Sequence, residues 1–320
     1  MKERVTIGID MGGTNTAFGI CTINGDCIAE GNISTTAYKD IDEYISNLIQ
    51  SIKDIFTSIS EKYELAGVGV GAPSGNYRTG YIEDSANLPW KGRIPFCKKL
   101  EEQLQVPVFI TNDANAATLG EMIYGGAKGM KDFVMITLGT GLGSGFVSNG
   151  RMIYGNNGLA GEFGHTIAVT NGRECGCGKK GCLETYCSAT GVKRTAIELM
   201  ATTTTPSELR NIPYNNLTSK DIAIAATNGD ALAKQVFNIT AEILGGALSN
   251  IVAITGPEAI FLMGGLTKAG DLLFTPLKQA MDKNLMFLFK DSVQVLPSAI
   301  KGNVAILGAA ALAWSELQNQ

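Results

Sequence analysis

The sequence predicts an α/β protein made of two lobes, each built on a mixed β-sheet flanked by helices. The chain has 320 residues, which is more than one hydrophobic core usually serves. Apolar runs of strand length alternate with segments of helical periodicity. A pattern of strand, glycine-rich loop, strand and Asn-Gly turn occurs twice, about 125 residues apart, as expected for two lobes of like topology.

The first copy of the pattern opens the chain. The β-branched run Val5–Ile9 leads into the loop Asp10-Met11-Gly12-Gly13-Thr14, and Asn24-Gly25 indicates a tight hairpin. Asp40 and Glu43 are placed like a capping box at the start of an amphipathic helix. Further strands are expected over 17–23, 68–72 and 106–110, and helices over 41–59 and 114–124.

The second copy begins at Phe133. The strand Phe133–Thr137 runs into Leu138-Gly139-Thr140-Gly141-Leu142-Gly143, and Asn149-Gly150 follows. A third strand-to-glycine junction is expected at 259–266, a polar surface loop at 202–219, and a packed alanine-rich helix at 304–317. We therefore expect a small lobe over 1–113 plus about 304–320, and a large lobe over 114–303.

Composition restricts the class of protein. The net charge is −4 with no basic run, which argues against nucleic-acid partners. A strand-like run follows Met1-Lys2-Glu3-Arg4 directly, so no signal peptide is expected, and no apolar run is judged long enough to span a membrane. The remaining cysteines are scattered and are expected to be buried or free thiols of a reducing compartment: Cys21, Cys27, Cys97 and Cys187. These features predict a cytoplasmic protein.

One histidine and three cysteines fall within a short stretch. His165, the only histidine of the chain, precedes Cys175, Cys177 and Cys182. A Cys₃His set suits a closed, tetrahedral, structural zinc site. A disulfide is the first alternative, although Cys175 and Cys177 are too close in sequence to pair easily. A redox pair is the second, but its usual spacing is Cys-x-x-Cys.

The two glycine loops predict contacts with phosphate. Backbone N–H groups approach an anion closely where no side chain intervenes, so two such loops could hold a polyphosphate chain. Neither loop is a Walker A motif. Asp10 in the first loop makes sense with Mg²⁺ between carboxylate and phosphate, and the alternative is a helix or turn cap.

Asn112 and Asp113 lie where a strand meets a helix. This is the usual position of catalytic groups in α/β folds, and a carboxylate there could take the proton of a hydroxyl that attacks a phosphate. The alternative is an N-cap, for which Asn and Asp are favoured. The two roles are compatible.

Together these motifs resemble the ROK family of sugar kinases. The resemblance rests on Asp10-x-Gly-Gly-Thr, Asn112-Asp113-Ala-Asn, Leu138-Gly-Thr-Gly-x-Gly, Gly161-Glu-x-Gly-His165 and Cys175-x-Cys-Gly-x-x-Gly-Cys182-x-Glu184, in that order over essentially the whole chain. It implies an actin-like, hexokinase-type ATPase fold with a central cleft. It also implies phosphorylation of a hexose by ATP and Mg²⁺, usually of glucose at its 6-hydroxyl, and a homodimer.

The resemblance implies a role for each matching position. Asp113 looks like the catalytic base and Asp10 like the organiser of Mg²⁺ and phosphate. The first phosphate loop is Gly12, Gly13 and Thr14, the second is Thr140, Gly141 and Gly143, and the adenosine-side turn is Gly264, Gly265 and Leu266. The zinc ligands are His165, Cys175, Cys177 and Cys182. Sugar contacts are implied for Gly75, Asn87, Asn112, Asp113, Glu162, His165 and Glu184. Thr111 departs from the pattern, since many relatives carry Glu there.

The spacing of the cluster agrees with a sugar pocket. Glu162 precedes His165 by three residues and Glu184 follows Cys182 by two, so fixing the metal fixes both carboxylates. His165 is expected to bind zinc through one ring nitrogen and to donate to a sugar hydroxyl through the other. Trp90 could stack on a sugar, but packing is favoured.

Three rival hypotheses remain. The first is a kinase for another sugar: N-acetylglucosamine, N-acetylmannosamine, fructose or allose. The second is a sugar-responsive repressor, which the negative charge and the short stretch before the first strand disfavour. The third is a sugar-binding relative without activity, against which Asp10, Asp113 and both loops argue.

Overall fold

The computed structural model describes residues 2–85 and 87–318. The chain forms two compact units, each described here on its own. The first comprises the chain up to Met130, Met152–Ala160 and the part from Ala299; the second comprises Lys131–Arg151 and Gly161–Ser298. These bounds differ from the expected lobes in assigning 114–130, 152–160 and 299–303 to the first unit. The first of these segments belongs there because the helix over Asp113–Tyr124 packs on the C-terminal helix. The lobe boundaries stay a prediction.

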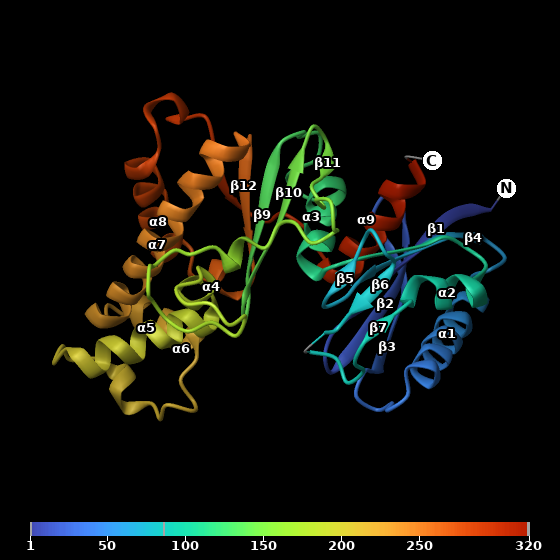
Figure 1. The fold of residues 1–320 in the computed structure, drawn as a ribbon, viewed down its shortest axis with the longest axis horizontal. Helices are drawn as coiled ribbons and strands as arrows, with labels where there is room; N and C mark the ends of the chain where they lie inside the picture. The colour runs from blue at the N-terminus through green and yellow to red at the C-terminus, as the bar shows by residue number, and fades with distance from the viewer. Residues whose placement is uncertain (1, 86, 319–320) are drawn as a thin grey trace. The chain divides into compact units, whose positions relative to one another are not determined.

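The first unit contains a five-stranded mixed sheet (Figure 1). Its strands are β1 Glu3–Met11, β2 Asn15–Thr22, β3 Cys27–Ser34, β4 Tyr63–Gly71 and β8 Val108–Thr111. A small sheet is formed by β5 Gly75–Asn76, β6 Tyr81–Glu83 and β7 Arg93–Ile94. The helices are α1 Ile41–Thr57, α2 Phe96–Leu104, α3 Asp113–Tyr124 and α9 Val304–Gln318. The order of the main sheet is β3-β2-β1-β4-β8, with β1, β4 and β8 parallel to one another.

The two faces of this sheet have different partners. Because strand side chains alternate, Ile7 and Ile9 belong to one face, and they share a hydrophobic core with Tyr44 of α1. On the other face α9, red in Figure 1, lies against β1 and β4. A Cβ at Gly8 would stand 2.0 Å from the Ile306 carbonyl oxygen, so the absence of a side chain there lets α9 lie directly on the strand.

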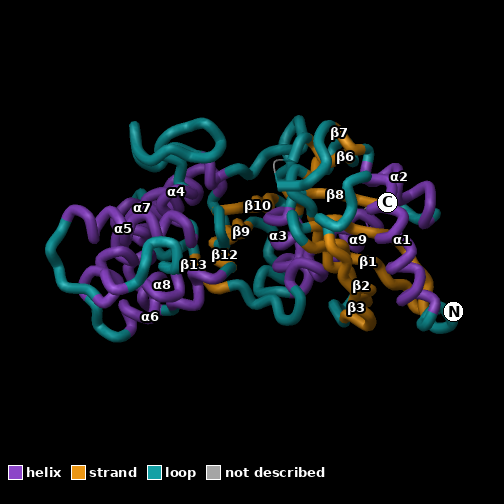
Figure 2. The backbone as a smooth tube through the Cα atoms, turned by 90° about the horizontal axis from the view of Figure 1, so that it is seen from below, coloured by secondary structure: helices purple, strands orange, loops and turns teal. Residues whose placement is uncertain are grey.

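The second unit contains another five-stranded sheet and most of the helices. Its strands are β9 Phe133–Leu138, β10 Leu142–Ser148, β11 Arg151–Met152, β12 Ala259–Met263 and β13 Gln294–Pro297. Its helices are α4 Glu184–Cys187, α5 Ala189–Thr202, α6 Ser219–Thr227, α7 Ala231–Thr255 and α8 Asp271–Asn284. Short 3₁₀ helices lie at Phe163–His165, Glu208–Asn211, Gly265–Ala269 and Phe287–Phe289. Figure 2 shows α5, α6, α7 and α8 grouped together.

The repeat expected from the sequence is confirmed by the strand order. The second sheet runs β11-β10-β9-β12-β13, which matches the order of the first sheet strand by strand. In each sheet a glycine loop joins two antiparallel strands, β1 to β2 and β9 to β10, and two parallel strands follow. Both loops therefore lie at the same edge of their own sheet, at the carboxyl end of its central strand.

Helix α7 bears on the expectation that no apolar run is long enough to span a membrane. Among the described residues it is the one helix long and apolar enough to cross a membrane, by length and composition alone. Half of its most apolar window is buried inside the structure, and Leu244, Leu248 and Val252 belong to the core of the second unit. A buried core helix passes the same test, because it too is apolar on most of its surface.

Candidate functional site

Three residues form a row at one edge of the first sheet. Asp10 of β1 is paired with Gly71 of β4, and Gly71 is paired with Thr111 of β8. All three strands are parallel, so their carboxyl ends meet at this edge, where α/β proteins bind ligands. Asn112 and Asp113 follow Thr111 directly. The sheet register thus brings Asp10 and Asp113 to one place.

The helix after β8 confirms the capping role of Asn112. Its side chain accepts a hydrogen bond of 2.7 Å from the backbone N–H of Asn115, and its backbone is extended, as an N-cap requires. Asp113 is the first residue of α3, and its side chain is exposed and accepts a 3.0 Å bond from the Ala114 N–H. The cap therefore fixes Asp113 at the helix start with its carboxylate open to solvent.

Asp10 lies in a different environment from Asp113. Burial raises the pKa of its carboxyl to about 6, and the negative charge of Asp113 contributes in the same direction. A nearby cation would stabilise the ionised form of a carboxylate that is costly to ionise in the free protein. This property suits a ligand of Mg²⁺.

The first glycine loop closes tightly between β1 and β2. The Gly12 N–H donates to the Asn15 carbonyl, 2.9 Å away, and the Thr35 hydroxyl donates to the Gly12 carbonyl at 2.8 Å. A Cβ at Gly13 would stand 2.6 Å from the backbone oxygen of Asn87. The structure thus places Asn87, whose side chain is exposed, directly against the loop, while Thr14 is exposed at its tip.

Gly75 lies close to the same row of strand ends. A Cβ there would stand 2.5 Å from the Thr111 carbonyl oxygen, so a larger residue would displace the end of β8. Trp90 belongs to the core of this unit, with its ring centroid 4.5 Å from that of Tyr44, which confirms that it packs.

In the second unit the four predicted metal ligands come together. The ligand atoms of His165, Cys175, Cys177 and Cys182 all lie within 4.8 Å of one another. The sulfurs of Cys177 and Cys182 are 3.6 Å apart, and Cys175 Sγ is 3.7 Å from His165 Nδ1. Ligands of a tetrahedral zinc ion stand about 3.5–3.8 Å apart, as follows from the usual bond lengths. The four residues therefore fit zinc.

Glu184 connects this cluster with the second glycine loop. One of its carboxylate oxygens accepts a bond from the Leu142 N–H at 3.1 Å, and the other lies 3.6 Å from Cys175 Sγ. A Cβ at Gly141 would stand 2.3 Å from the Glu184 carboxylate. The metal cluster, Glu184 and the glycine loop thus form one continuous structure within the second unit.

His165 has its two ring nitrogens in different surroundings. Nδ1 faces Cys175 inside the cluster, whereas Nε2 lies 4.0 Å from a carboxylate oxygen of Glu162. Metal binding through Nδ1 leaves Nε2 with its hydrogen as a donor beside the exposed Glu162 carboxylate. Glu162 and His165 Nε2 together offer an acceptor and a donor to a polar ligand.

The second glycine loop is held by the start of α5. The Ala189 N–H donates to the Gly139 carbonyl at 2.8 Å, and the Thr190 hydroxyl donates to the Thr140 carbonyl at 3.0 Å. Thr140 is exposed, whereas Gly143 donates its N–H to the Thr137 hydroxyl within the sheet. The tip of the loop is therefore the part open to a ligand.

The three residues of the turn after β12 differ in how much space surrounds them. Gly264 has φ +113° and would clash with the Leu138 carbonyl if it carried a Cβ. No described atom lies within 4 Å of a Cβ built on Gly265, whereas Leu266 is buried in the core of the unit. Of the three predicted adenosine-side residues, Gly265 is the one with open space beside it.

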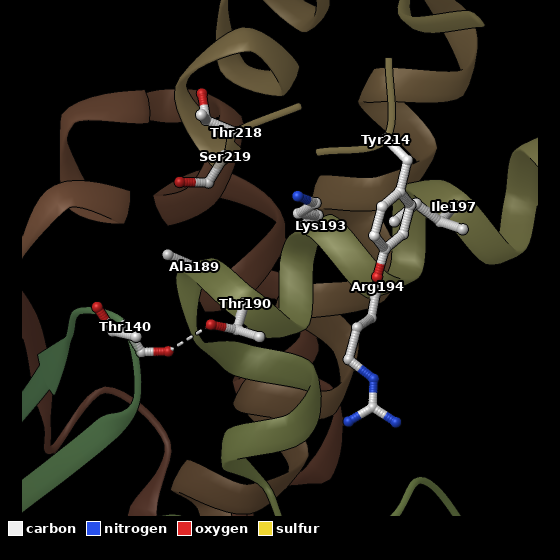
Figure 3. Close-up of a pocket in the computed structure, with 9 residues that line it drawn as sticks. All are labelled: Thr140, Ala189, Thr190, Lys193, Arg194, Ile197, Tyr214, Thr218 and Ser219. Carbon is white, nitrogen blue, oxygen red and sulfur yellow. Dashed lines mark hydrogen bonds between the residues drawn. The ribbon is translucent and has the colours of Figure 1, made fainter. Parts of the chain in front are cut away.

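A pocket of about 470 Å³ adjoins the second glycine loop (Figure 3). Its lining residues are Thr140, Ala189, Thr190, Lys193, Arg194, Ile197, Tyr214, Thr218 and Ser219. They include two cations and no carboxylate, and the Lys193 ammonium lies 4.8 Å from the centre of the Tyr214 ring. Figure 3 shows Lys193 beside Tyr214 and the bond from Thr190 to Thr140.

No sequence motif predicts this pocket. Tyr214 and Thr218 belong to the polar segment that was expected to be a surface loop. The segment is anchored rather than free: the Arg210 guanidinium donates to the carbonyls of Met200, Thr203 and Thr205, and Leu209 is buried. Tyr214, an aromatic residue in a polar segment, was the available sequence signal. Its proximity to Lys193 arises only in the folded protein.

Comparison with known proteins agrees with this geometry. A family model described as "ROK family" matches residues 6–316. A glucokinase of Halalkalibacterium halodurans is 37% identical over 314 residues, covering 96% of this chain and 94% of that protein. A xylose repressor of Bacillus subtilis is 26% identical, covering 97% of this chain and 77% of its own length.

A solved structure supports the fold class as well. The ROK family glucokinase of Streptomyces griseus, determined in complex with glucose and AMPPNP, superimposes with a TM-score of 0.77 at 30% identity. The match covers 97% of this chain and 99% of that one. The expected actin-like ATPase fold with mixed sheets flanked by helices is thereby confirmed. The chain belongs to the ROK family.

Proposed function

We propose that this chain is a sugar kinase that transfers the terminal phosphoryl group of ATP to the 6-hydroxyl of glucose, with Mg²⁺. The observation that carries the proposal is the pair of unlike carboxylates, Asp10 and Asp113, beside the first glycine loop. Glucokinases at 30–37% identity over almost the whole chain support the choice of substrate.

The two carboxylates take separate roles. Asp113 accepts the proton of the attacking hydroxyl, because its exposed side chain is fixed at the start of α3. Asp10 would hold Mg²⁺, which would supply neutralisation of the phosphate charge, and Gly12, Gly13 and Thr14 would approach the phosphates with backbone N–H groups. In-line transfer needs little else beyond positioning and charge stabilisation.

Two sets of residues are proposed to contact the sugar. Asn112, Gly75 and Asn87 would supply polar groups in one set, and Glu162, His165 and Glu184 in the other. A saccharide offers hydroxyls only, so carboxylates and amides in fixed directions provide its recognition. Zinc held by His165, Cys175, Cys177 and Cys182 orders these side chains when bound and takes no part in the transfer.

The nucleotide lies along the second loop. Thr140, Gly141 and Gly143 contact its phosphates, and the turn at Gly264, Gly265 and Leu266 lies on the adenosine side. The pocket beside Thr140 accommodates the base and ribose, with Tyr214 providing an aromatic face. Tyr214→Ala is expected to raise the KM for ATP several-fold and leave the KM for sugar unchanged, whereas Tyr214→Phe retains the ring.

The decisive experiment is a substrate panel with coupled detection of ADP. Glucose, N-acetylglucosamine, N-acetylmannosamine, fructose and allose are compared with ATP and Mg²⁺, for wild type and for Asp113→Ala. We expect turnover of glucose above the other sugars, and a loss of about 10²–10⁴-fold in kcat for the variant with its fold intact. A preference for an N-acetylhexosamine would overturn glucose as substrate, and near-normal turnover by the variant would overturn Asp113 as the base.

A sugar-responsive regulator is the second candidate, since a xylose repressor also matches most of this chain. Two assays on the same purified protein distinguish the two functions. A regulator would bind sugar without producing ADP and would protect a specific DNA segment. A kinase would turn over sugar and leave DNA unprotected.

A further inference from the structure

Two cysteines outside the metal cluster lie in contact. Cys21 of β2 and Cys27 of β3 are directly paired across antiparallel strands, and their sulfurs are 2.7 Å apart. The Asn24-Gly25 signal predicts the hairpin that joins them but not its register, so the sequence alone suggests only scattered thiols. Neither residue belongs to the strand-end row or to the metal cluster.

The pairing satisfies the geometry of a disulfide. Residues directly opposite in antiparallel strands have Cα atoms about 4.5–5.5 Å apart, and a disulfide requires about 4.4–6.8 Å. The register shifts between Ile20 and Cys21, so the two cysteines lie at an irregularity, Cys21 before the turn and Cys27 after it. The backbone therefore needs no rearrangement for the two sulfurs to bond.

The two thiols differ in their exposure to solvent. Cys21 is fully buried against α9, in contact with a small core that includes Ile306 and Ala310. Cys27 is only half-buried and follows the turn at Asn24-Gly25. A reagent from solvent thus reaches Cys27 first, and Cys21 stands behind it.

We propose that Cys21 and Cys27 form a redox-active dithiol that is oxidised reversibly to an intramolecular disulfide by a low-molecular-weight disulfide such as oxidised glutathione. The Cys27 thiolate attacks one sulfur of the reagent, whose S–S bond breaks and releases one thiolate. Cys21 then loses its proton and attacks the Cys27 sulfur of the mixed disulfide, releasing the second thiolate. Two protein thiols are oxidised and one reagent disulfide is reduced to two thiols, so the electrons balance.

The hydrogen bonding of the pair supports this order of attack. The bond from the Cys21 thiol lowers the pKa of Cys27, although burial and the charges of Glu30 and Asp26 act against it. The same bond, together with burial, raises the pKa of Cys21. A more acidic, more accessible thiol beside a buried one is the arrangement of an attacking and a resolving cysteine.

The test uses the full-length, zinc-loaded protein and oxidised glutathione as the probe. After exposure, free thiols are alkylated and the protein is digested with trypsin. The peptide Val5–Lys39 contains both cysteines and no other, so it separates them from the metal cluster. We expect this peptide to lose two hydrogen masses and to escape alkylation, and reduction to restore both thiols. Cys97, buried elsewhere in the same unit, is expected to stay a thiol.

Single variants show whether the pair acts as proposed. Cys21→Ser is expected to leave Cys27 as a persistent mixed disulfide with glutathione, whereas Cys27→Ser is expected to leave Cys21 unmodified. The wild-type result is decisive even if a variant fails to fold. Cys97 is the reference for a cysteine that stays a free thiol. If Cys21 and Cys27 of the oxidised wild-type protein were alkylated as completely as Cys97, the proposal would be overturned.

Discussion

Asp113 contributes to the raised pKa of Asp10, although the two residues belong to different elements of the first unit. Burial is the larger cause and the charge of Asp113 the second, and together they bring the pKa of Asp10 to about 6. Asp113 itself is exposed at the start of α3. Two neighbouring carboxylates in unlike environments can divide their work, one binding a cation and the other accepting a proton.

The first prediction concerns pH and stability. The pKa of Asp10 is higher in the folded than in the unfolded protein, so its contribution to stability is full below pH 4 and is lost as pH rises through about 6. Without Mg²⁺, Asp10→Asn should therefore gain stability relative to wild type between pH 4 and 7, by about 3 kcal/mol. Urea unfolding of both proteins across this range measures the difference, and a constant difference would contradict the assignment.

A second variant isolates the influence of Asp113. Asp113→Asn removes one negative charge and keeps the shape of the side chain, so the pKa of Asp10 should fall while remaining above its ordinary value. Carbon-detected NMR titration of the Asp10 carboxyl reports this directly. An unchanged titration midpoint would show that the two groups do not interact.

The second prediction separates the two roles of Asn112. Serine is also a good N-cap, so Asn112→Ser should leave stability near wild type, whereas Asn112→Ala should lose about 1 kcal/mol. Both variants lack the amide and should raise the KM for sugar alike. If only Asn112→Ala raised the KM for sugar and Asn112→Ser did not, Asn112 would act only as a cap.

The third prediction concerns chelation of the zinc proposed for the Cys₃His cluster. Chelation should weaken sugar binding far more than ATP binding, because the cluster positions His165, Glu162 and Glu184. Calorimetric titration of the treated protein with glucose and with ATP measures both, and added zinc should restore the loss. Cys177→Ser should behave like the chelated protein, with Cys97→Ser as a matched control outside the cluster. Equal loss of both affinities would indicate general unfolding.

Much of the fold could be predicted because its signals are local. A β-branched run followed by glycines marks each central strand, and the recurrence of that pattern at Phe133 predicts the second sheet. The four residues of the Cys₃His cluster could be predicted as a group because their chemistry is distinctive and their spacing short. The N-cap at Asn112 follows from its position between a strand and an amphipathic helix.

Other features depend on how segments of the chain pair or pack against one another in the folded protein. The proximity of Lys193 and Tyr214 arises because α5 and the polar segment return to the same side of the second unit. The contact of Cys21 with Cys27 depends on the register of a hairpin, which an irregularity shifts. Local patterns carry no information on such pairings, since register is set by packing and turn geometry together.

The fourth prediction tests the contact between Glu184 and the second glycine loop. A Cβ at Gly141 would stand 2.3 Å from the Glu184 carboxylate, so Gly141→Ala must displace either the loop or the carboxylate. We expect a loss of about 1–3 kcal/mol in the free energy of unfolding, together with a higher KM for sugar. Gly139→Ala is the matched control, because within the described structure nothing lies within 4 Å of its Cβ position.

A double-mutant cycle identifies the cause. In the background Glu184→Ala the overlapping carboxylate is absent, so adding Gly141→Ala should cost little further stability. The coupling energy should then be close to the full effect of Gly141→Ala alone. If Gly141→Ala remained equally costly without Glu184, backbone strain in the loop rather than the carboxylate would be responsible. Glu184 would then not connect the Cys₃His cluster with the second glycine loop.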